Sequence, residues 1–186
     1  MSTMRQFCVQ CGKSTENTFQ PFCECGGMTD VEYDLGKVEF HDSPNPYVRF
    51  ADLLPIRTLH DRLPADARYT PTIHAVRLGA RLGMPSLYLK NETVLPTCTT
   101  KDRMAAVSLA YLSECGVRAF CTSSSGNSST SYAYAIRAHP DLRLYLFTAE
   151  SFLRRVQHAD HAQVVHFGLR DASFVEAFEF AGTYAQ

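Results

Sequence analysis

Apolar residues recur with two different spacings along the second half of this chain. Between Met104 and Leu112 the spacing is roughly helical, which predicts a helix over residues 100–115 that ends at Gly116. Further helices are predicted over 130–139, 149–159 and 171–185, and strands over 86–92, 117–122, 142–147 and 162–167. Strands that alternate with helices of this size are typical of βαβ units. The predicted fold class is therefore α/β, with a parallel sheet covered on both faces.

The composition is that of an ordinary globular protein. The chain has 186 residues, of which 45% are hydrophobic and 20% charged, enough for one domain and a small module. Its formal net charge of -1 offers no basic field for nucleic acid or an anionic membrane, so neither partner is expected. No apolar run approaches the roughly 20 residues that cross a bilayer, and the N-terminus lacks the apolar core of a signal peptide. We expect a cytoplasmic protein.

Four of the seven cysteines lie close together near the N-terminus. The segments "CVQCGK" and "CECGG" place Cys8, Cys11, Cys23 and Cys25 within eighteen residues, with glycines behind each pair. Four thiolates suit a tetrahedral structural zinc, which a segment this short needs in order to fold. The second pair is C-x-C rather than C-x-x-C, and reduced cysteines without metal remain the alternative. Pro44 and Pro46 mark an extended linker. We therefore predict a zinc-ribbon-like module with its linker over 1–42 and a second domain over 43–186.

Two loops in the second domain carry candidate chemistry. In a parallel sheet, ligands lie outside the carboxyl ends of the strands, where helices begin. The loop "LPTCTTKDR" puts Lys101 in the first turn of a helix, a place that favours acids over cations. The loop "TSSSGNSST", residues 122–130, turns at Gly126 and offers hydroxyl and amide groups to a carboxylate or phosphate. Either loop alone is ordinary, but together they predict a lysine that faces a serine-rich anion site.

This pairing resembles the fold-type II pyridoxal-phosphate enzymes, and specifically the threonine synthase family. The family's P-T-G-S-F-K-D-R loop, which carries the cofactor-linked lysine, is matched at Pro96, Thr97, Lys101, Asp102 and Arg103. "LYLKNE" and "TSSSGN" are similar to two further family segments. The C-G-G after the cysteines and "VRFADLLP" resemble two more. The matches follow one another in the family's order from Cys8 to about residue 180.

The resemblance implies a role for each matched residue. Lys101 would be the catalytic lysine that binds pyridoxal phosphate, and Asn127 would donate to the ring oxygen of the cofactor. Lys90 would hold an anionic group of the substrate, and the substrate carboxylate would be bound by Ser124, Ser125 and Ser128. The implied reaction is elimination or replacement on a phosphorylated amino acid such as O-phosphohomoserine. A cysteate-synthase-like β-replacement on phosphoserine is the nearest alternative.

The chain also departs from the family pattern. Cys98, Thr99 and Thr100 replace glycine, serine and phenylalanine before the lysine, and a cysteine adopts glycine's conformations less easily. We therefore expect the loop to run differently. The chain is about half the expected family length, and the only glycines after Asn127 are Gly168 and Gly182, too far apart for a phosphate-binding loop. One expectation is a homodimer or a second chain that supplies the missing half, and another is that this sequence is a piece of a longer protein. A non-catalytic scaffold subunit and a zinc-ribbon interaction module are the others.

Overall fold

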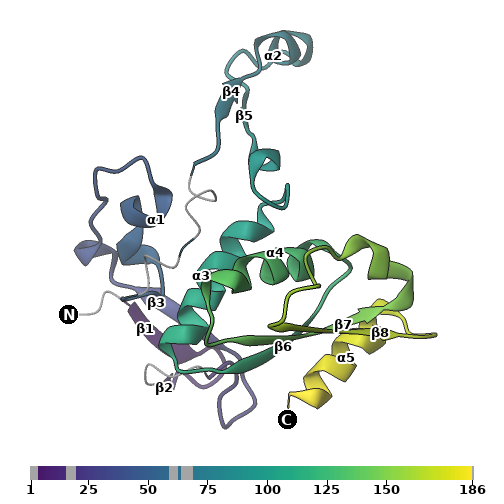
Figure 1. The fold of residues 1–186 in the computed structure, drawn as a ribbon. Coiled ribbons are helices and arrows are strands. Elements are labelled where there is room, and N and C mark those ends of the chain that lie inside the picture. The colour runs from purple at the N-terminus through teal and green to yellow at the C-terminus, as the bar shows by residue number, and fades with distance from the viewer. Residues whose placement is uncertain (1–3, 16–19, 59–62, 64–68, 186) are drawn as a thin grey trace.

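Three parts of the chain are distinct in the structure. The structure is a computed structural model, and it describes residues 4–15, 20–58, 63 and 69–185. A small antiparallel sheet at the N-terminus lies beside a helix-covered parallel sheet, and an arm projects away from both (Figure 1). No helix in the described part is both long and apolar enough to span a membrane.

The N-terminal part is a three-stranded antiparallel sheet. Its strands are β1 (Met4–Cys8), β2 (Ser14–Thr15) and β3 (Thr29–Tyr33), in the order β2-β1-β3. Two short 3₁₀ helices, η1 (Leu35–Lys37) and η2 (Ala51–Leu53), flank helix α1 (Pro46–Arg49). The α1 residue Tyr47 is buried against Ala106 and Ala110, so α1 packs with later residues of the predicted second domain and not with the small sheet.

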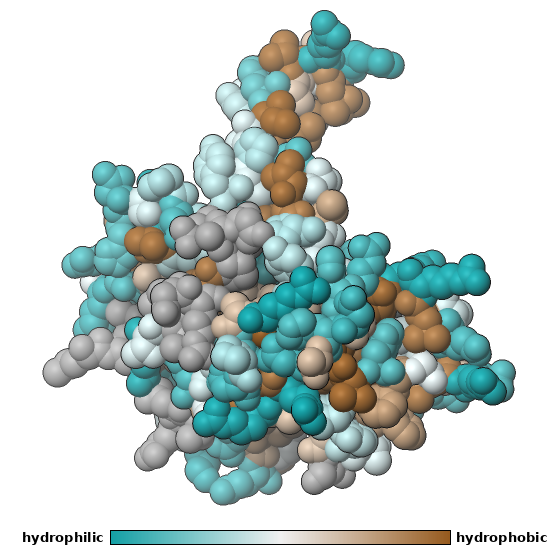
Figure 2. All heavy atoms as spheres, viewed as in Figure 1, coloured by the Kyte–Doolittle hydropathy of each residue, from teal (hydrophilic) through white to brown (hydrophobic). Residues whose placement is uncertain are grey.

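The arm is formed by β4 (Thr72–His74), α2 (Val76–Leu82) and β5 (Tyr88–Lys90). The predicted strand over 86–92 is thus only three residues long, and it pairs antiparallel with β4 instead of joining the parallel sheet. That part of the parallel-sheet prediction was wrong, because β4 is too short to be recognised from its sequence. Apolar side chains are exposed on the arm, as the brown surface at the top of Figure 2 shows; they include Ile73, Val76, Leu78, Leu82, Met84 and Leu89.

A parallel sheet forms the core of the second domain, as predicted. Its strands are β6 (Ala119–Ser123), β7 (Arg143–Ala149) and β8 (Val164–Leu169), in the order β6-β7-β8. β6 therefore lies at one edge of this sheet, with β7 as its one neighbour in the described chain. Helices α3 (Lys101–Glu114) and α4 (Asn127–Ala135) cover one face, and α5 (Phe174–Tyr184) covers the other (Figure 1). The mixed α/β fold class is confirmed.

Strand β7 shows why the sheet is covered on both faces. Leu144 and Leu146 are fully buried on the α3–α4 side, among the alanine and leucine side chains of those two helices. Phe147 points to the opposite face, where its ring lies 5.5 Å from that of Phe180 and 5.1 Å from that of Tyr184 in α5. Because successive strand residues point to opposite faces, an apolar run such as "LRLYLF" requires helices on both.

One predicted helix was wrong. Residues 149–159 form only the six-residue 3₁₀ helix η7 (Glu150–Arg155). The Thr130 hydroxyl in α4 donates to the carbonyl of Arg155 at 3.3 Å and accepts from the N–H of Gln157 at 3.1 Å. These bonds hold the chain after Arg155 in a non-helical path across the start of α4. Helix α4 itself begins at Asn127, three residues before the predicted start, and continues as the 3₁₀ helix η6 (Ile136–Ala138).

Candidate functional site

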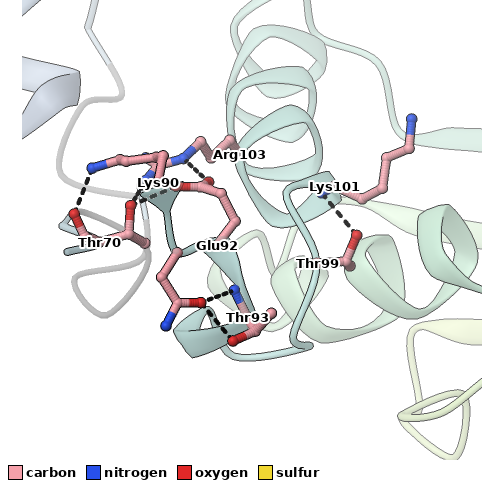
Figure 3. Close-up of polar contacts among 8 residues, drawn as sticks. Thr70, Lys90, Glu92, Thr93, Thr99, Lys101 and Arg103 are labelled. Atoms are coloured by element: carbon pink, nitrogen blue, oxygen red, sulfur yellow. Dashed lines mark hydrogen bonds and ion pairs between the residues drawn. The ribbon is translucent and has the colours of Figure 1, made fainter. Parts of the chain in front are cut away.

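Lys101 is the first residue of α3, and its side chain is exposed. Its backbone N–H donates to the Thr99 hydroxyl at 3.4 Å (Figure 3). Its amine extends away from the polar cluster around Arg103 and has no polar partner within the described chain. An exposed, unpaired amine at a helix start is available to react with a ligand. The assignment of Lys101 as the catalytic lysine stays a prediction.

The loop before Lys101 contains a strained residue. Cys98 has φ of +58°, in the left-handed region that favours glycine. Its N–H donates to the carbonyl of Leu95 at 2.8 Å, which closes a tight turn. A cysteine therefore occupies a glycine-type conformation, at a cost that the surrounding hydrogen bonds must offset.

In the serine-rich loop, some side chains form hydrogen bonds within the protein and others are exposed to solvent. The Ser124 hydroxyl accepts from the N–H groups of Gly126 at 3.2 Å and Ser129 at 3.0 Å, and it donates to the Ser129 hydroxyl at 2.8 Å. Ser124 therefore caps the start of α4, a role that the sequence analysis did not foresee. Ser125 and Asn127 are exposed and Ser128 is half-buried. Binding of a substrate carboxylate by Ser124, Ser125 and Ser128, and of a cofactor by Asn127, stays a prediction.

A close approach of η7 fixes the turn of this loop. Gly126 has φ of +146°, and a Cβ added there would lie 3.0 Å from Cβ of Arg155. Both the backbone conformation and the space require glycine at this position. The neighbouring hydroxyl oxygen of Ser123 is buried and has no hydrogen-bond partner within the described chain. The end of β6 thus contains a buried polar atom whose hydrogen-bonding capacity is not used within the described chain.

A hydrogen bond joins the segment before α3 to the start of α4. The Thr97 hydroxyl lies 3.0 Å from the Ser131 hydroxyl, one turn into α4. Lys101 and the serine-rich loop therefore begin adjacent helices at the same edge of the sheet, the carboxyl edge at which α/β proteins bind ligands. The amine of Lys101, the amide of Asn127 and the hydroxyl of Ser125 can all donate hydrogen bonds. This donor set suits a ligand that is rich in oxygen and negatively charged.

Lys90 lies in a separate polar cluster on the arm side of α3. Its amine donates to the carbonyl of Thr70 at 2.5 Å and lies 5.4 Å from the ring centre of Tyr69. Figure 3 shows Lys90 directed toward Thr70, whereas Lys101 points away from this cluster. The structure does not bring the two lysines together, and the role of Lys90 in holding an anionic group stays a prediction.

The same cluster contains an ion pair that the sequence analysis missed. Arg103 donates to Glu92 through Nε at 2.6 Å and through Nη2 at 3.1 Å, and the Thr70 hydroxyl donates to the same carboxylate at 2.5 Å. The hydrogen bonds from Arg103 lower the pKa of Glu92 to about 2. The pair joins the segment after the arm to the first turn of α3. Both residues lie inside recognised motifs, but nothing in the sequence signals that they pair.

The N-terminal cysteines converge as predicted. Within the described chain, Cys8, Cys11, Cys23 and Cys25 are the one group of side chains that could hold a metal ion, and their Sγ atoms all lie within 4.8 Å of one another. The Cys8–Cys25 and Cys11–Cys23 distances are 3.5 and 3.8 Å. Tetrahedral zinc with bonds of about 2.3 Å requires sulfur atoms about 3.8 Å apart. The backbone N–H of Cys11 lowers the pKa of Cys8 to about 6.

A family model and several known proteins match this chain. The model for pyridoxal-phosphate dependent enzymes matches residues 64–186. The chain is 31% identical over 144 residues to the threonine synthase of Methanocaldococcus jannaschii. This alignment covers 73% of this chain and 36% of that protein. It is 26% identical over 136 residues to the cysteate synthase of Methanosarcina mazei, which covers 69% and 32%. The chain thus spans about a third of the length of the curated relatives it matches.

The fold is also found in a solved structure. The processed form of threonine deaminase isoform 2 from Solanum lycopersicum superimposes with a TM-score of 0.50 at 23% identity, over 62% of this chain and 31% of that one. At this level of identity the likeness concerns the fold alone. It agrees with the fold-type II architecture that the sequence motifs predicted.

Proposed function

Because this chain belongs to the pyridoxal-phosphate dependent enzyme family, we propose that it is the lysine-bearing part of a threonine synthase-like enzyme. The proposed reaction is elimination or replacement on a phosphorylated amino acid such as O-phosphohomoserine. The names of the relatives support this substrate class, since they include threonine synthases and cysteate synthases. The observation on which the proposal depends is the position of Lys101, unpaired and exposed, at a helix start bonded to that of the serine-rich loop.

The described residues fit one end of the cofactor. The Lys101 amine and the Asn127 amide suit an aldehyde and a ring oxygen, and the orphan Ser123 hydroxyl shows that polar capacity is left unused beside them. They do not supply a phosphate-binding loop. Gly168 lies in β8, where an added Cβ would come 2.8 Å from the Leu153 side chain, so this glycine serves packing. Gly182 lies within α5.

Each residue has a definite task in the proposed reaction. Bound pyridoxal phosphate supplies an electron sink for the negative charge that develops at the substrate α-carbon. Lys101 holds the cofactor, and its amine takes the α-proton and returns it. Asn127 orients the cofactor ring through its amide. The hydroxyls of Ser125 and Ser128 bind the substrate carboxylate, since the Ser124 hydroxyl donates its proton to Ser129. Lys90 binds the anionic leaving group once its amine has left the carbonyl of Thr70.

Borohydride trapping tests the assignment of Lys101. The chain contains four lysines, Lys13, Lys37, Lys90 and Lys101, so peptide mass mapping resolves every lysine on which the cofactor can be fixed. The purified chain is incubated with pyridoxal phosphate, reduced with borohydride, digested and mapped. We expect label on Lys101 at a cofactor concentration that leaves the other three unlabelled.

Two variants control this experiment. Lys101→Ala should abolish the specific label, and Lys37→Ala, a change at an exposed surface lysine paired with Asp34, should leave it intact. Equal labelling of all four lysines, or a Lys101 that is never labelled even with a companion chain present, would refute the proposed function. The non-catalytic scaffold predicts that second result.

A cysteate-synthase-like activity is the second candidate, since two of the similar proteins carry that name. The two activities differ in substrate, O-phosphohomoserine against phosphoserine. Phosphate release from each, measured with the same preparation, separates them. Release from phosphoserine alone favours the cysteate-synthase-like reaction, and the presence of Cys98 in place of glycine is consistent with a changed substrate.

We also propose that the N-terminal cysteines bind a structural zinc ion. The sulfur distances support tetrahedral coordination, and Gly27 supports it too, because an added Cβ there would lie 2.7 Å from the sulfur of Cys8. One zinc per chain is expected by elemental analysis. Cys11→Ser should lose it and Cys98→Ser, a change at another exposed cysteine, should keep it. Metal-free protein that is as stable as the zinc-loaded form would contradict the proposal. Binding of a partner that survives deletion of everything after Asp42 would favour the interaction-module alternative.

In this proposal the rest of the enzyme is supplied by a longer version of this chain, by a companion polypeptide or by a second copy. The comparisons align the chain with about a third of each relative, and the arm exposes apolar side chains. Analytical ultracentrifugation of the chain alone, and of the chain with any co-purifying partner, tests this. A strictly monomeric chain that is fully active would contradict it.

A further inference from the structure

Two hydrogen bonds between Thr97 and Asp102 join the ends of the lysine-bearing loop, so that the loop and these bonds form a closed ring. Asp102 accepts from the backbone N–H of Thr97 at 2.8 Å through Oδ2 and from its hydroxyl at 2.5 Å through Oδ1. Both carboxylate oxygens of Asp102 therefore accept hydrogen bonds from Thr97, five positions earlier in the chain. The residues between them, which include the left-handed Cys98 and Lys101, are held in a loop of fixed ends.

This ring is anchored to α4. The Thr97 hydroxyl donates to Asp102, so at the 3.0 Å contact with Ser131 the serine hydroxyl is the donor. Asp102 is 3% exposed and Ser131 is fully buried. Because water reaches neither group, each bond of the chain Ser131–Thr97–Asp102 contributes more to rigidity than an exposed bond would.

The ring leaves Lys101 out of its polar contacts. Asp102 follows Lys101 in sequence, yet its carboxylate turns into the protein toward Thr97, and the Lys101 side chain is exposed. Neighbouring residues of a helix do not face each other, so Asp102 points into the protein, where Thr97 engages both its oxygens, while Lys101 points outward.

We propose that Thr97, Asp102 and Ser131 are positioning residues that fix the lysine-bearing loop against α4 and hold the Lys101 amine beside the serine-rich loop. The inference deepens the proposed function and rests on it. None of the three residues touches the cofactor in this scheme. They act through the backbone of residues 98–101, whose strained turn at Cys98 persists only while the ends of the loop are bonded.

Four variants test the inference on the full chain. Thr97→Val removes the hydroxyl but keeps the shape, Thr97→Ser keeps the hydroxyl, and Ser131→Ala removes the link to α4. Thr100→Val is the matched control, because Thr100 lies in the same loop and its side chain makes no capping bond. Each is measured for hydrogen exchange of the loop amides, for borohydride-trapped cofactor on Lys101 at a fixed low pyridoxal phosphate concentration, and for melting temperature.

We expect Thr97→Val to speed exchange of the loop amides and to lower Lys101 labelling, each by about tenfold, the effect of one lost bond to a buried charged group. Thr97→Ser should restore both values, Ser131→Ala should give a smaller loss, and Thr100→Val should match the wild type. Rescue by serine is the readout that a merely structural role would not produce, because serine fills the site less well than valine.

Labelling and exchange that are unchanged in Thr97→Val would overturn the inference. A loss that Thr97→Ser shares in full would do the same, because it would assign the effect to the methyl group. Should Thr97→Val fail to fold, Ser131→Ala decides by the same two measurements. If Lys101 of the wild type takes no label, the proposed function is overturned instead. This result differs from the one in which the wild type is labelled and Thr97→Val is labelled equally well.

Discussion

Replacement of Glu92 by glutamine should cost stability in a pH-dependent way. The Arg103–Glu92 pair is mostly buried, with side chains 25% and 22% exposed. Hydrogen bonds from Arg103 lower the pKa of Glu92 from 4.5 to about 2. A shift of one pKa unit corresponds to 1.36 kcal/mol, so the lowered pKa of Glu92 corresponds to about 3 kcal/mol of stabilisation at neutral pH. Residual exposure and the bonds that glutamine keeps reduce the expected loss in Glu92→Gln to roughly 2 kcal/mol.

The direction of the pH dependence follows from the lowered pKa. The folded state holds the charged carboxylate more strongly than the unfolded state does, so the stabilisation is complete above pH 4.5. It declines as the pH falls toward 2, where the folded carboxylate also becomes protonated. The wild type and Glu92→Gln should therefore differ most at pH 7 and converge near pH 2.

Urea unfolding measures this difference. The chain has nine tyrosines and no tryptophan, so tyrosine fluorescence and circular dichroism are suitable probes. Glu32→Gln is the matched control, because Glu32 forms an exposed pair with Arg5 and should show no measurable effect. A loss in Glu92→Gln that is the same at pH 3 as at pH 7, or one no greater than that of Glu32→Gln, would refute the reasoning.

Three further substitutions have definite expected outcomes. Gly27→Ala places a Cβ 2.7 Å from the Cys8 sulfur, so we expect less bound zinc by elemental analysis; a full zinc content would count against the site. Cys98→Gly removes left-handed strain and should raise the unfolding free energy by about 0.5–1 kcal/mol in urea, after the entropy of glycine is deducted. Ser173→Ala breaks the reciprocal cap with Glu176 and should destabilise α5 by about 1 kcal/mol, seen as faster amide exchange there but not in α3.

Local patterns predicted the elements of the second domain that are long and regularly spaced. Helix α3 begins at Lys101 and ends at Glu114, within one residue of the prediction at each end, because its apolar spacing and Gly116 are local signals. Helix η7 was mispredicted because Thr130, more than twenty residues earlier, bonds to its last turn. Strand β4 was missed because its three residues are defined only by pairing with β5.

The candidate site shows the same division. The motifs predicted that the four cysteines converge, which the structure confirms, since their spacing is itself the signal. The roles of Lys101 and Asn127, predicted in the same way, stay predictions. The motifs did not show that Lys90 bonds to Thr70, because that contact depends on how segments twenty residues apart pack. The Ser124 cap spans only five residues, but the run of serines does not indicate which hydroxyl turns back to α4. The Glu92–Arg103 pair joins two elements eleven residues apart, and neither charge signals a partner on its own.

The position of β6 determines where an additional strand would lie. This strand runs parallel to β7, and its last residue, Ser123, leads directly into the serine-rich loop. A strand that pairs in parallel with the outer side of β6 would have its carboxyl end at the same edge of the sheet. The turn that follows this strand would then lie on the side of Lys101 and Asn127. Extension of the sheet at this edge would therefore enlarge the candidate site as a direct result of chain direction.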